Sequence, residues 1–364
     1  MNDIARRNWV VASCVAATLL LTTSSMAAQD AVELEDWQQE ELESLIEVVA
    51  AVQGGELVAQ DNPFSLDPSF LKGADGKTEV PFTLTIDASK VNASTVGLFL
   101  FVEEHRAATA ATAEEDEDDD DSDSSDRPAD LAAYSAQLLG TGEFRDANYF
   151  PVTADGTEPI TIPHFFSAPG GTYDVYVAIR DSSGGSEDDA QTSTVLLLRE
   201  ELEVPDFWTP QLATSSILVT EVLEPMAEPL TAEQLQQFPY SFGTLRIVPK
   251  LDRSFGKQEE LGMIFFVYNA GLKDATKPDV TIEYDFHQRT ADGEEFFNKT
   301  NPQQFNPETL PPDFDANLGY QIIGGQTIPL TLFPAGDYRL AIKVTDNTSG
   351  TELMRELVFT VRGT

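Results

Sequence analysis

Near its end, the chain contains the stretch Phe333-Pro-Ala-Gly-Asp-Tyr-Arg-Leu-Ala-Ile-Lys-Val-Thr-Asp346. Pro334 and Gly336 predict a turn, because proline presets one backbone torsion and glycine adopts conformations that other residues avoid. From Tyr338 onward, apolar side chains alternate with polar ones, which is the period of a strand with one buried face. The stretch therefore predicts a turn followed by a half-buried strand.

The same turn-and-strand pattern occurs earlier in the chain, at an offset of 165 residues. At that offset, 97–102 also matches 262–267 in sequence. Several blocks that share one offset predict an internal duplication. Each half consists of short strands separated by turn signals, with no helical period, which favours two tandem antiparallel β-sandwiches. The matching residues are Pro169 with Pro334, Gly171 with Gly336, Tyr173 with Tyr338 and Asp181 with Asp346.

The Pro-x-Gly-x-Tyr motif, followed by alternating apolar residues and an aspartate, resembles the closing strands of immunoglobulin-like and fibronectin-like sandwiches. The resemblance implies that Tyr173 and Tyr338 stand at the tyrosine corner of those folds, where the hydroxyl bonds back to the backbone. It gives the prolines and glycines of the motif a structural role. The chain also resembles exported bacterial proteins that carry tandem domains of this kind. A motif of this type indicates fold and leaves function open.

Residues 1–27 have the pattern of a signal peptide. Two arginines precede an apolar run, and small residues on both sides of Met26 fit a cleavage site. Two other export signals remain open, a lipoprotein box that ends in Cys14 and a twin-arginine signal. Cys14 is the one cysteine of the chain, so no disulfide is expected after cleavage. The sequence predicts an exported protein of the periplasm, the cell envelope or the extracellular space.

The remaining chain divides by composition into a helix and two sandwiches. Residues 28–61 combine acidic residues with apolar residues at helical spacing, which predicts a short acidic helix and a linker. The first β-sandwich is expected at 62–203, interrupted by an acidic disordered insertion at 105–142. A proline-containing linker at 204–215 leads to the second β-sandwich at 216–364.

Three predicted strands are apolar at consecutive positions, at 98–102, 195–198 and 263–268. Both faces of such a strand are apolar, whereas a strand of an isolated sandwich needs only one apolar face. The second face needs a cover, and three covers are possible: the acidic helix, the sister domain or a partner.

The charge of the chain excludes some partners. Acidic residues number 62 against 22 basic ones, which gives a net charge of −40. A polyanion is repelled by nucleic-acid phosphates and by anionic membrane surfaces. Nucleic acids and anionic membranes are therefore not expected as partners.

The most acidic stretch is 114–126, in which ten of thirteen residues are Asp or Glu. Asp119, Asp121 and Asp123 fall at the first three ligand positions of an EF-hand loop. However, Ser124 occupies the position at which that loop requires glycine. The sequence therefore assigns no metal site and predicts weak association with divalent cations at most.

One strand carries residues with catalytic chemistry. The alternation over 280–288 places Glu283, Asp285 and His287 on one face. This strand nearly matches a motif of sandwich-fold glycoside hydrolases, but Gln288 stands where that motif has its general acid. The other histidines are isolated, and the chain has no phosphate-binding glycine loop. No catalytic residue and no cofactor are expected.

These observations favour a non-enzymatic binding or structural module that engages another protein or an envelope polymer. The alternative is a carbohydrate-binding sandwich or a glycoside hydrolase-like protein. A sugar site needs exposed aromatic rings, because sugars stack on them. Phe296, Phe297 and the proline-containing loop at 301–315 are the candidates for such a site.

Overall fold

The computed structural model describes residues 36–55, 63–91, 95–105, 138–139, 145–153, 159–181, 194–291 and 293–363. The predicted signal peptide and the cation candidates Asp119, Asp121 and Asp123 lie outside these residues. Among the described residues, no helix has both the length and the apolar composition to span a membrane.

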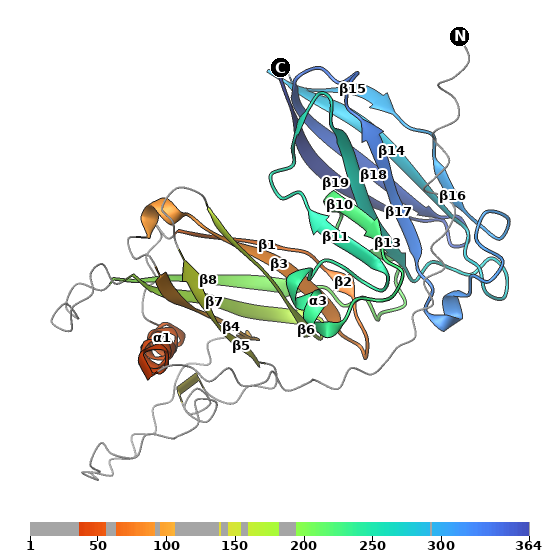
Figure 1. The fold of residues 1–364 in the computed structure, drawn as a ribbon. Helices are drawn as coiled ribbons and strands as arrows, with labels where there is room; N and C mark the ends of the chain where they lie inside the picture. The colour runs from red at the N-terminus through yellow and green to blue at the C-terminus, as the bar shows by residue number, and fades with distance from the viewer. Residues whose placement is uncertain are drawn as a thin grey trace. The chain divides into compact units, whose positions relative to one another are not determined.

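Chain contacts define two compact units (Figure 1). The N-terminal unit comprises the described parts of Ser24–Pro68 and Thr83–Asp206. The C-terminal unit comprises Ser69–Phe82 and the described parts of Phe207–Thr364. A segment from within the predicted first sandwich thus groups with the second. Both units are built mainly of antiparallel β-strands, as the alternation of side chains predicts.

The first part of the chain forms one helix and two four-stranded sheets. One sheet has the order β1-β3-β2 with β6 paired to β3, and the other has the order β5-β4-β7-β8. The elements are α1 (Asp36–Gln53), β1 (Phe64–Pro68), β2 (Leu71–Lys72), β3 (Thr78–Ile86), η1 (Ala88–Lys90), β4 (Thr95–Glu104), β5 (Arg145–Thr153), β6 (Ile160–Ala168), β7 (Gly171–Asp181) and β8 (Thr194–Val204).

Helix α1 covers the second apolar face of the β5-β4-β7-β8 sheet (Figure 1). The buried helix residues include Leu42, Leu45 and Val49, and they pack on Phe99 and Phe101 of β4. The other residues of this cluster are Ile46, Val52, Leu139, Tyr176, Ala178 and Leu197. In this unit, the acidic helix α1 covers the second apolar face of β4.

Two polar contacts hold α1 on the sheet, one in its second turn and one at its C-terminal end. The Tyr149 hydroxyl on β5 donates to the Glu41 carboxylate over 3.0 Å, and the Gln53 side chain donates to Glu103 on β4. Burial and the nearby Glu41 charge raise the pKa of Tyr149. Gly97 lies directly beneath the first contact, and a Cβ atom there would overlap both Tyr149 and Glu41. The helix therefore approaches the sheet this closely because residue 97 has no side chain.

The C-terminal unit is a sandwich of a five-stranded and a six-stranded sheet. The first has the order β11-β10-β13-β17 with β9 paired to β13, and the second has the order β12-β19-β18-β14-β15 with β16 paired to β14. The elements are β9 (Ala213–Thr214), β10 (Leu218–Pro225), α3 (Ala232–Gln237), β11 (Leu245–Pro249), β12 (Ser254–Gly256), β13 (Glu260–Tyr268), β14 (Val280–Thr290), β15 (Gly293–Lys299), β16 (Gln303–Phe305), η2 (Ala316–Leu318), β17 (Ile322–Pro329), β18 (Gly336–Asp346) and β19 (Thr351–Arg362).

Alternating residues of both sheets fill the core of this sandwich. Met263 and Phe265 of β13 face Ile282 and Tyr284 of β14, together with Leu340 of β18, in one buried cluster. Burying these side chains removes apolar area from water, which is the main favourable contribution to folding. The described strand pairs of these two sheets run antiparallel, except that β12 and β19 run parallel.

The second face of β13, which carries Phe266 and Tyr268, also has a cover. Leu71 of β2, Phe207 of the predicted linker and Tyr240, which follows α3, pack on it. All three covering residues are buried, at 7%, 4% and 2% exposure. The cover is therefore supplied by other segments of the same unit.

Hydrogen bonds tie the segment at 69–82 into this unit. The backbone N–H of Phe70 donates to the Ser216 hydroxyl over 2.9 Å, and that of Lys72 donates to the Tyr268 hydroxyl over 3.1 Å. Burial raises the pKa of Tyr268. These bonds explain why the segment groups with the later part of the chain, whereas composition placed it in the range 62–203.

The predicted duplication holds for one part of the fold. Strands β7 and β18 have the same bounds after the offset, and both are flanked as β5-β4-β7-β8 and β15-β14-β18-β19. The match of 97–102 with 262–267 is not structural, because β4 pairs with β7 whereas β13 lies in the sheet opposite β18. The two apolar runs match in sequence because β4 and β13 are each buried on both faces.

The tyrosine motif has the same geometry in both units. The Tyr173 hydroxyl donates to the Pro169 carbonyl over 2.9 Å, and the Tyr338 hydroxyl donates to the Pro334 carbonyl over 2.8 Å. The two glycines differ, since Gly336 has a φ of 151° while Gly171 does not lie in the left-handed region. Gly336 is therefore required by its backbone conformation.

Some elements were not predicted. Helix α3 contradicts the expectation that neither half contains a helix, and its capping box from Thr231 to Gln234 explains why so short a helix forms. The range 301–315, predicted as a loop, contains the short strand β16. Phe314 is buried there, at 6% exposure, and Phe305 packs on the core, so this segment belongs to the sandwich.

Candidate functional site

The outer face of the six-stranded sheet in the C-terminal unit gathers most of the residues with functional chemistry. Alternate residues of β14 and β18 point into the core, so the others share the opposite face. We call this the outer sheet face. Its residues are Glu283, Asp285, His287 and Arg289 of β14, Glu294 and Phe296 of β15, Arg339 and Lys343 of β18, and Glu352, Met354, Glu356 and Val358 of β19.

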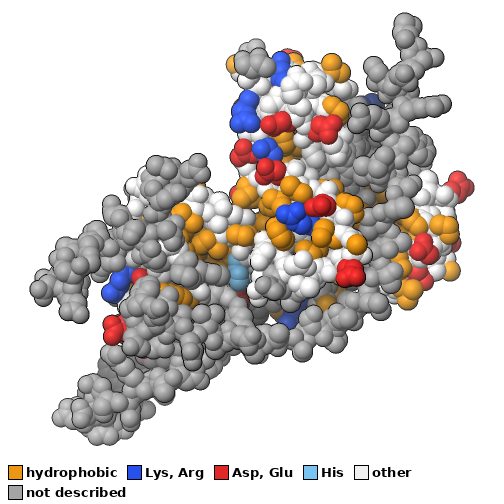
Figure 2. All heavy atoms as spheres, in the orientation of Figure 1, with side chains coloured by type: hydrophobic (Ala, Val, Ile, Leu, Met, Phe, Trp, Pro, Cys, Tyr) orange, Lys and Arg blue, Asp and Glu red, His pale blue; other side chains and the backbone are white. Residues whose placement is uncertain are grey.

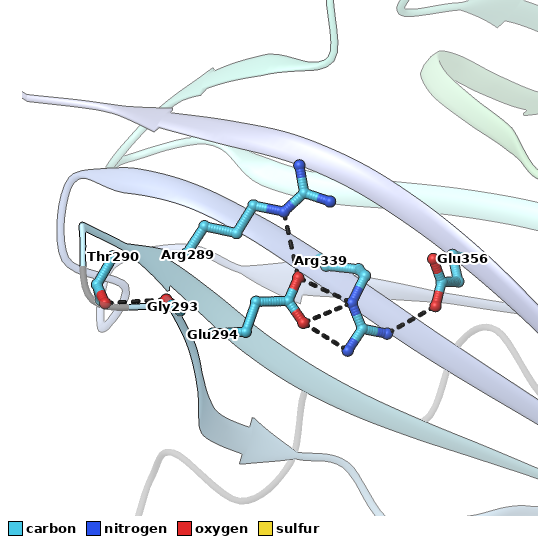
Figure 3. A network of polar contacts seen from close by, with 6 residues as sticks. All are labelled: Arg289, Thr290, Gly293, Glu294, Arg339 and Glu356. Carbon is cyan, nitrogen blue, oxygen red and sulfur yellow. Dashed lines mark hydrogen bonds and ion pairs between the residues drawn. The ribbon is translucent and has the colours of Figure 1, made fainter.

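A charge network crosses this face (Figure 3). Arg339 donates to Glu294 from Nε over 2.9 Å and from Nη2 over 2.8 Å, and from Nη1 to Glu356 over 2.9 Å. Arg289 also donates to Glu294 from Nε, over 3.2 Å. The hydrogen bonds from Arg339 are the main cause that lowers the pKa of Glu294 to about 2. Four strands are thereby joined through paired charges.

Exposed apolar side chains lie among these charges. Phe296 is 60% exposed, Met354 is 54% exposed and Val358 is 38% exposed. In register, His287 lies between Phe296 and Arg339, and its ring contacts the Phe296 ring edge-on at 5.9 Å. The face thus presents aromatic, methionine and arginine side chains, the residue types that are enriched where proteins bind one another.

The structure places Glu283, Asp285 and His287 of the predicted acidic strand on this face, and it holds Glu283 in an ion pair. Lys343 lies 2.7 Å from Glu283, and this contact raises the pKa of Lys343. Asp285 stands opposite Ala341, and Gln288 stands opposite Tyr338. A glycosidase needs two carboxyl groups on either side of one bond. The geometry here places Glu283 in an ion pair with a neighbouring strand instead.

The candidates for a sugar site have different surroundings. A β-bulge between Phe286 and His287 leaves Phe297 without a direct partner on β14. Phe296 points outward, while the half-buried Phe297 packs on Phe333 and Tyr338 at the edge of the core. Of the predicted pair, only Phe296 presents its ring to solvent.

A second polar cluster, which the sequence did not indicate, lies on the helix-covered face of β4, β7 and β8. Asp174 accepts hydrogen bonds from Arg199 over 3.2 Å, and it lies 2.9 Å from Nδ1 of His105. The adjacent Glu103, opposite Asp174 in register, receives the side chain of Gln53. Asp174 and Glu103 are almost fully buried, at 4% and 5% exposure.

This cluster supplies partners to two buried carboxylates where α1 ends. Burial is costly for an isolated carboxylate, and cationic and hydrogen-bonding partners offset that cost. Arg199, His105 and Gln53 supply them, and hydrogen bonding and charge from Asp174 outweigh burial, so the pKa of Arg199 is raised. In the sequence, Glu103 directly follows the apolar run 98–102, and this position was the one local sign of the cluster. Its partners come from other strands and could not be read locally.

Within the described ranges, no group of three or more His, Cys, Asp or Glu side chains is placed to hold a metal ion.

Hydrophobic side chains also gather over β10, β11 and α3 of the C-terminal unit (Figure 2). Arg246 lies there, 4.3 Å over the Phe238 ring and 2.9 Å from Glu224. Leu223 on β10 is 40% exposed. This surface offers a comparison for the outer sheet face.

No protein-family model matches this sequence, and no curated protein matches it. The similar solved structures include Salmonella alpha-2-macroglobulin reacted with methylamine, at 13% identity and a TM-score of 0.19, covering 84% of this chain and 17% of that one. Trypsin-activated alpha-2-macroglobulin from Escherichia coli is 12% identical, has a TM-score of 0.21, and is matched over 83% of this chain and 17% of that one. Red sea bream transglutaminase is 8% identical, has a TM-score of 0.20, and is matched over 87% of this chain and 33% of that one. Likeness at this level carries no functional argument, and the chain spans a third or less of each protein.

Proposed function

We propose that this chain is a non-enzymatic binding module that engages another protein through the outer sheet face. The observation that carries the proposal is the exposure of Phe296, Met354 and Val358 among paired charges on one face. Desolvating an apolar side chain is favourable, so a partner that covers these residues gains free energy. Export to the envelope or the extracellular space, as the pattern at 1–27 predicts, is part of this proposal.

The charge network supports a protein partner. Arg339 and Lys343 are already matched by Glu294, Glu356 and Glu283. A partner that covers them therefore meets paired charges, and its binding leaves no lone charge buried. Arginine held by carboxylates in this way is rigid, which lowers the entropy lost on binding.

A carbohydrate is the second candidate ligand, and the exposed ring of Phe296 favours it. A sugar stacks its apolar face on an aromatic ring and needs polar groups beside it. Arg289 and Glu294 lie near this ring in register, on the same pair of strands. The two candidates differ in Met354, which lies two strands away from β14 and matters only for a larger, protein-sized contact.

The test compares proteins captured from a native envelope extract by the wild-type chain and by variants, with retention quantified by mass spectrometry. We expect a specific protein to be retained by the wild type, lost with Phe296→Ala and with Met354→Ala, and kept by Leu223→Ala. Leu223→Ala is the matched control, since it removes an exposed apolar side chain elsewhere in the same unit. Equal retention by all four chains would overturn the proposal. If the wild type retains a glycan and only Phe296→Ala abolishes this retention, the ligand is a carbohydrate instead.

A further inference from the structure

Strand β19 has an open edge. On one side it pairs with β18 along Thr351–Val361. On the other side, β12 pairs only with Thr360–Arg362. Among the residues that the structure describes, no strand pairs with 351–359 on this side. An unpaired edge of this length is a template on which another strand can form backbone hydrogen bonds.

The backbone groups at this edge point outward at alternate residues. The N–H of Thr360 donates to the Arg253 carbonyl over 3.0 Å, away from β18. In an antiparallel strand, both backbone groups of a residue point to one side, and the side alternates along the chain. Val358, Glu356 and Met354 therefore point their N–H groups outward, as Thr360 does. The Arg355 side chain already donates to the outward Met354 carbonyl over 2.9 Å, so a strand added here has to displace that one contact.

The side chains beside the open edge form an alternating row. Glu352, Met354, Glu356 and Val358 follow one another on the outer sheet face. Their side chains all reach solvent, and the Glu352 and Glu356 side chains are 56% and 59% exposed, although each also pairs with a cation of β18, Lys343 at 3.6 Å and Arg339 at 2.9 Å. A strand added at this edge would place its own side chains directly opposite these four. On this face, the added strand would therefore meet acidic and apolar side chains of β19 in alternation.

We propose that the open edge of β19 binds an extended segment of a partner protein whose side chains alternate basic and apolar. This inference rests on the proposed function, because it adds the partner's chemistry and the binding mode. Backbone hydrogen bonds supply the affinity, and the alternating pattern supplies the register. Basic side chains would face Glu352 and Glu356, and apolar ones would face Met354 and Val358.

A basic partner is favoured by charge over a second copy of this chain. The chain carries a net charge of −40, so it attracts cationic segments and repels its own copies. Pairing β19 with β19 would also bring the rows of Glu352 and Glu356 together, and like charges on adjacent strands are destabilising. The same argument excludes an acidic extended segment.

The test uses a synthetic peptide of about nine residues that alternates lysine and valine, the length of the open edge. Its binding to the full chain is measured by calorimetry. We expect the Lys–Val peptide to bind and a Glu–Val peptide not to bind. Met354→Pro should weaken binding by about tenfold or more, because it removes one outward N–H that β18 does not use. Met354→Ala keeps that N–H and removes only the apolar side chain that the peptide's valines would face, so it should weaken peptide binding less than Met354→Pro does.

A second measurement does not depend on how the proline variant folds. The Lys–Val peptide methylated on alternate backbone nitrogens keeps its charges but cannot pair as a strand. We expect this peptide to lose binding, and we expect the unmodified peptide to slow amide hydrogen exchange at Met354, Glu356 and Val358. Equal binding by the methylated peptide would overturn the proposal, because attraction would then be electrostatic alone.

The outcomes separate this inference from the proposed function. If Phe296→Ala abolishes capture of the native protein while Met354→Pro leaves both capture and peptide binding intact, the face binds a protein and the strand proposal is wrong. If Met354→Pro and methylation abolish peptide binding while Phe296→Ala leaves native capture unchanged, strand addition at β19 stands. In that case the outer sheet face is not the contact surface.

Discussion

The Tyr149 hydroxyl donates a 3.0 Å hydrogen bond to the Glu41 carboxylate directly above Gly97, and it joins α1 to β5. A Cβ atom on residue 97 would overlap both partners of this bond. Gly97→Ala should therefore weaken the docking of α1 by about 1–3 kcal/mol, the usual cost of overpacking. Amide hydrogen exchange across 36–53 measures this as faster exchange.

Gly171→Ala is the matched control for that variant. A Cβ atom there would make only an ordinary 3.6 Å contact with the Tyr173 ring. Its effect should stay within about 0.5 kcal/mol. Unchanged exchange of α1 in Gly97→Ala would contradict the close approach of helix and sheet.

The helix cover predicts a large effect for its buried residues. Leu45 is fully buried between α1 and the sheet, so Leu45→Ala should destabilise the N-terminal unit by about 2–5 kcal/mol. Glu40→Ala, at an exposed position of the same helix, should change stability by about 0.5 kcal/mol or less. Urea titration followed by circular dichroism distinguishes the two. Equal midpoints would mean that α1 is not part of the folded unit.

The tyrosine motif predicts a paired result in the two units. Tyr338→Phe keeps the buried ring but leaves the Pro334 carbonyl without its donor, which should cost about 1–3 kcal/mol. Tyr173→Phe should behave alike, because its hydroxyl bonds the Pro169 carbonyl in the same way. Urea titration of the full chain gives the change in each unit. A neutral result for both variants would show that water replaces the hydroxyl at no cost.

The cover of β13 predicts that the second sandwich depends on an earlier segment. A fragment of 216–364 lacks Leu71 and Phe207, so it should expose Phe266 and Tyr268 and bind a hydrophobic dye. In the full chain, Leu71→Ala should destabilise the C-terminal unit by about 2–5 kcal/mol. Hydrogen exchange of β13 measures this loss. If the fragment is as protected as the full chain, a boundary at 204–215 divides two independent domains.

The charge network predicts an acid titration. Because the folded pKa of Glu294 is lowered to about 2 from an ordinary 4.5, its stabilising contribution is present above 4.5 and is lost as the pH falls toward 2. Carbon-detected NMR of the carboxyl group should give this midpoint. Arg339→Gln should raise the pKa of Glu294 more than Arg289→Gln does, since Arg339 makes the larger contribution. An ordinary midpoint in the wild type would mean that the pairs do not persist in solution.

Much of the architecture is readable from local patterns. Alternation and turn residues predicted β18 and its relationship to β7, because side-chain period and turn chemistry act over a few residues. Consecutive apolar residues in β4 and β13 indicated that both strands need a second cover. The same apolar runs produced the false match between 97–102 and 262–267, because burial on two faces favours similar residues in unrelated strands.

The sequence by itself determined the fold class and indicated a helix within 28–61 and a backbone contact for each motif tyrosine, since each depends on near neighbours in the chain. Only the tertiary structure decided which segment covers which face, because Leu71 and Phe266 meet across a long stretch of chain. Register, which is set by packing between distant strands, brings Arg339 beside Glu294 and leaves the edge of β19 open. No local pattern carries that information.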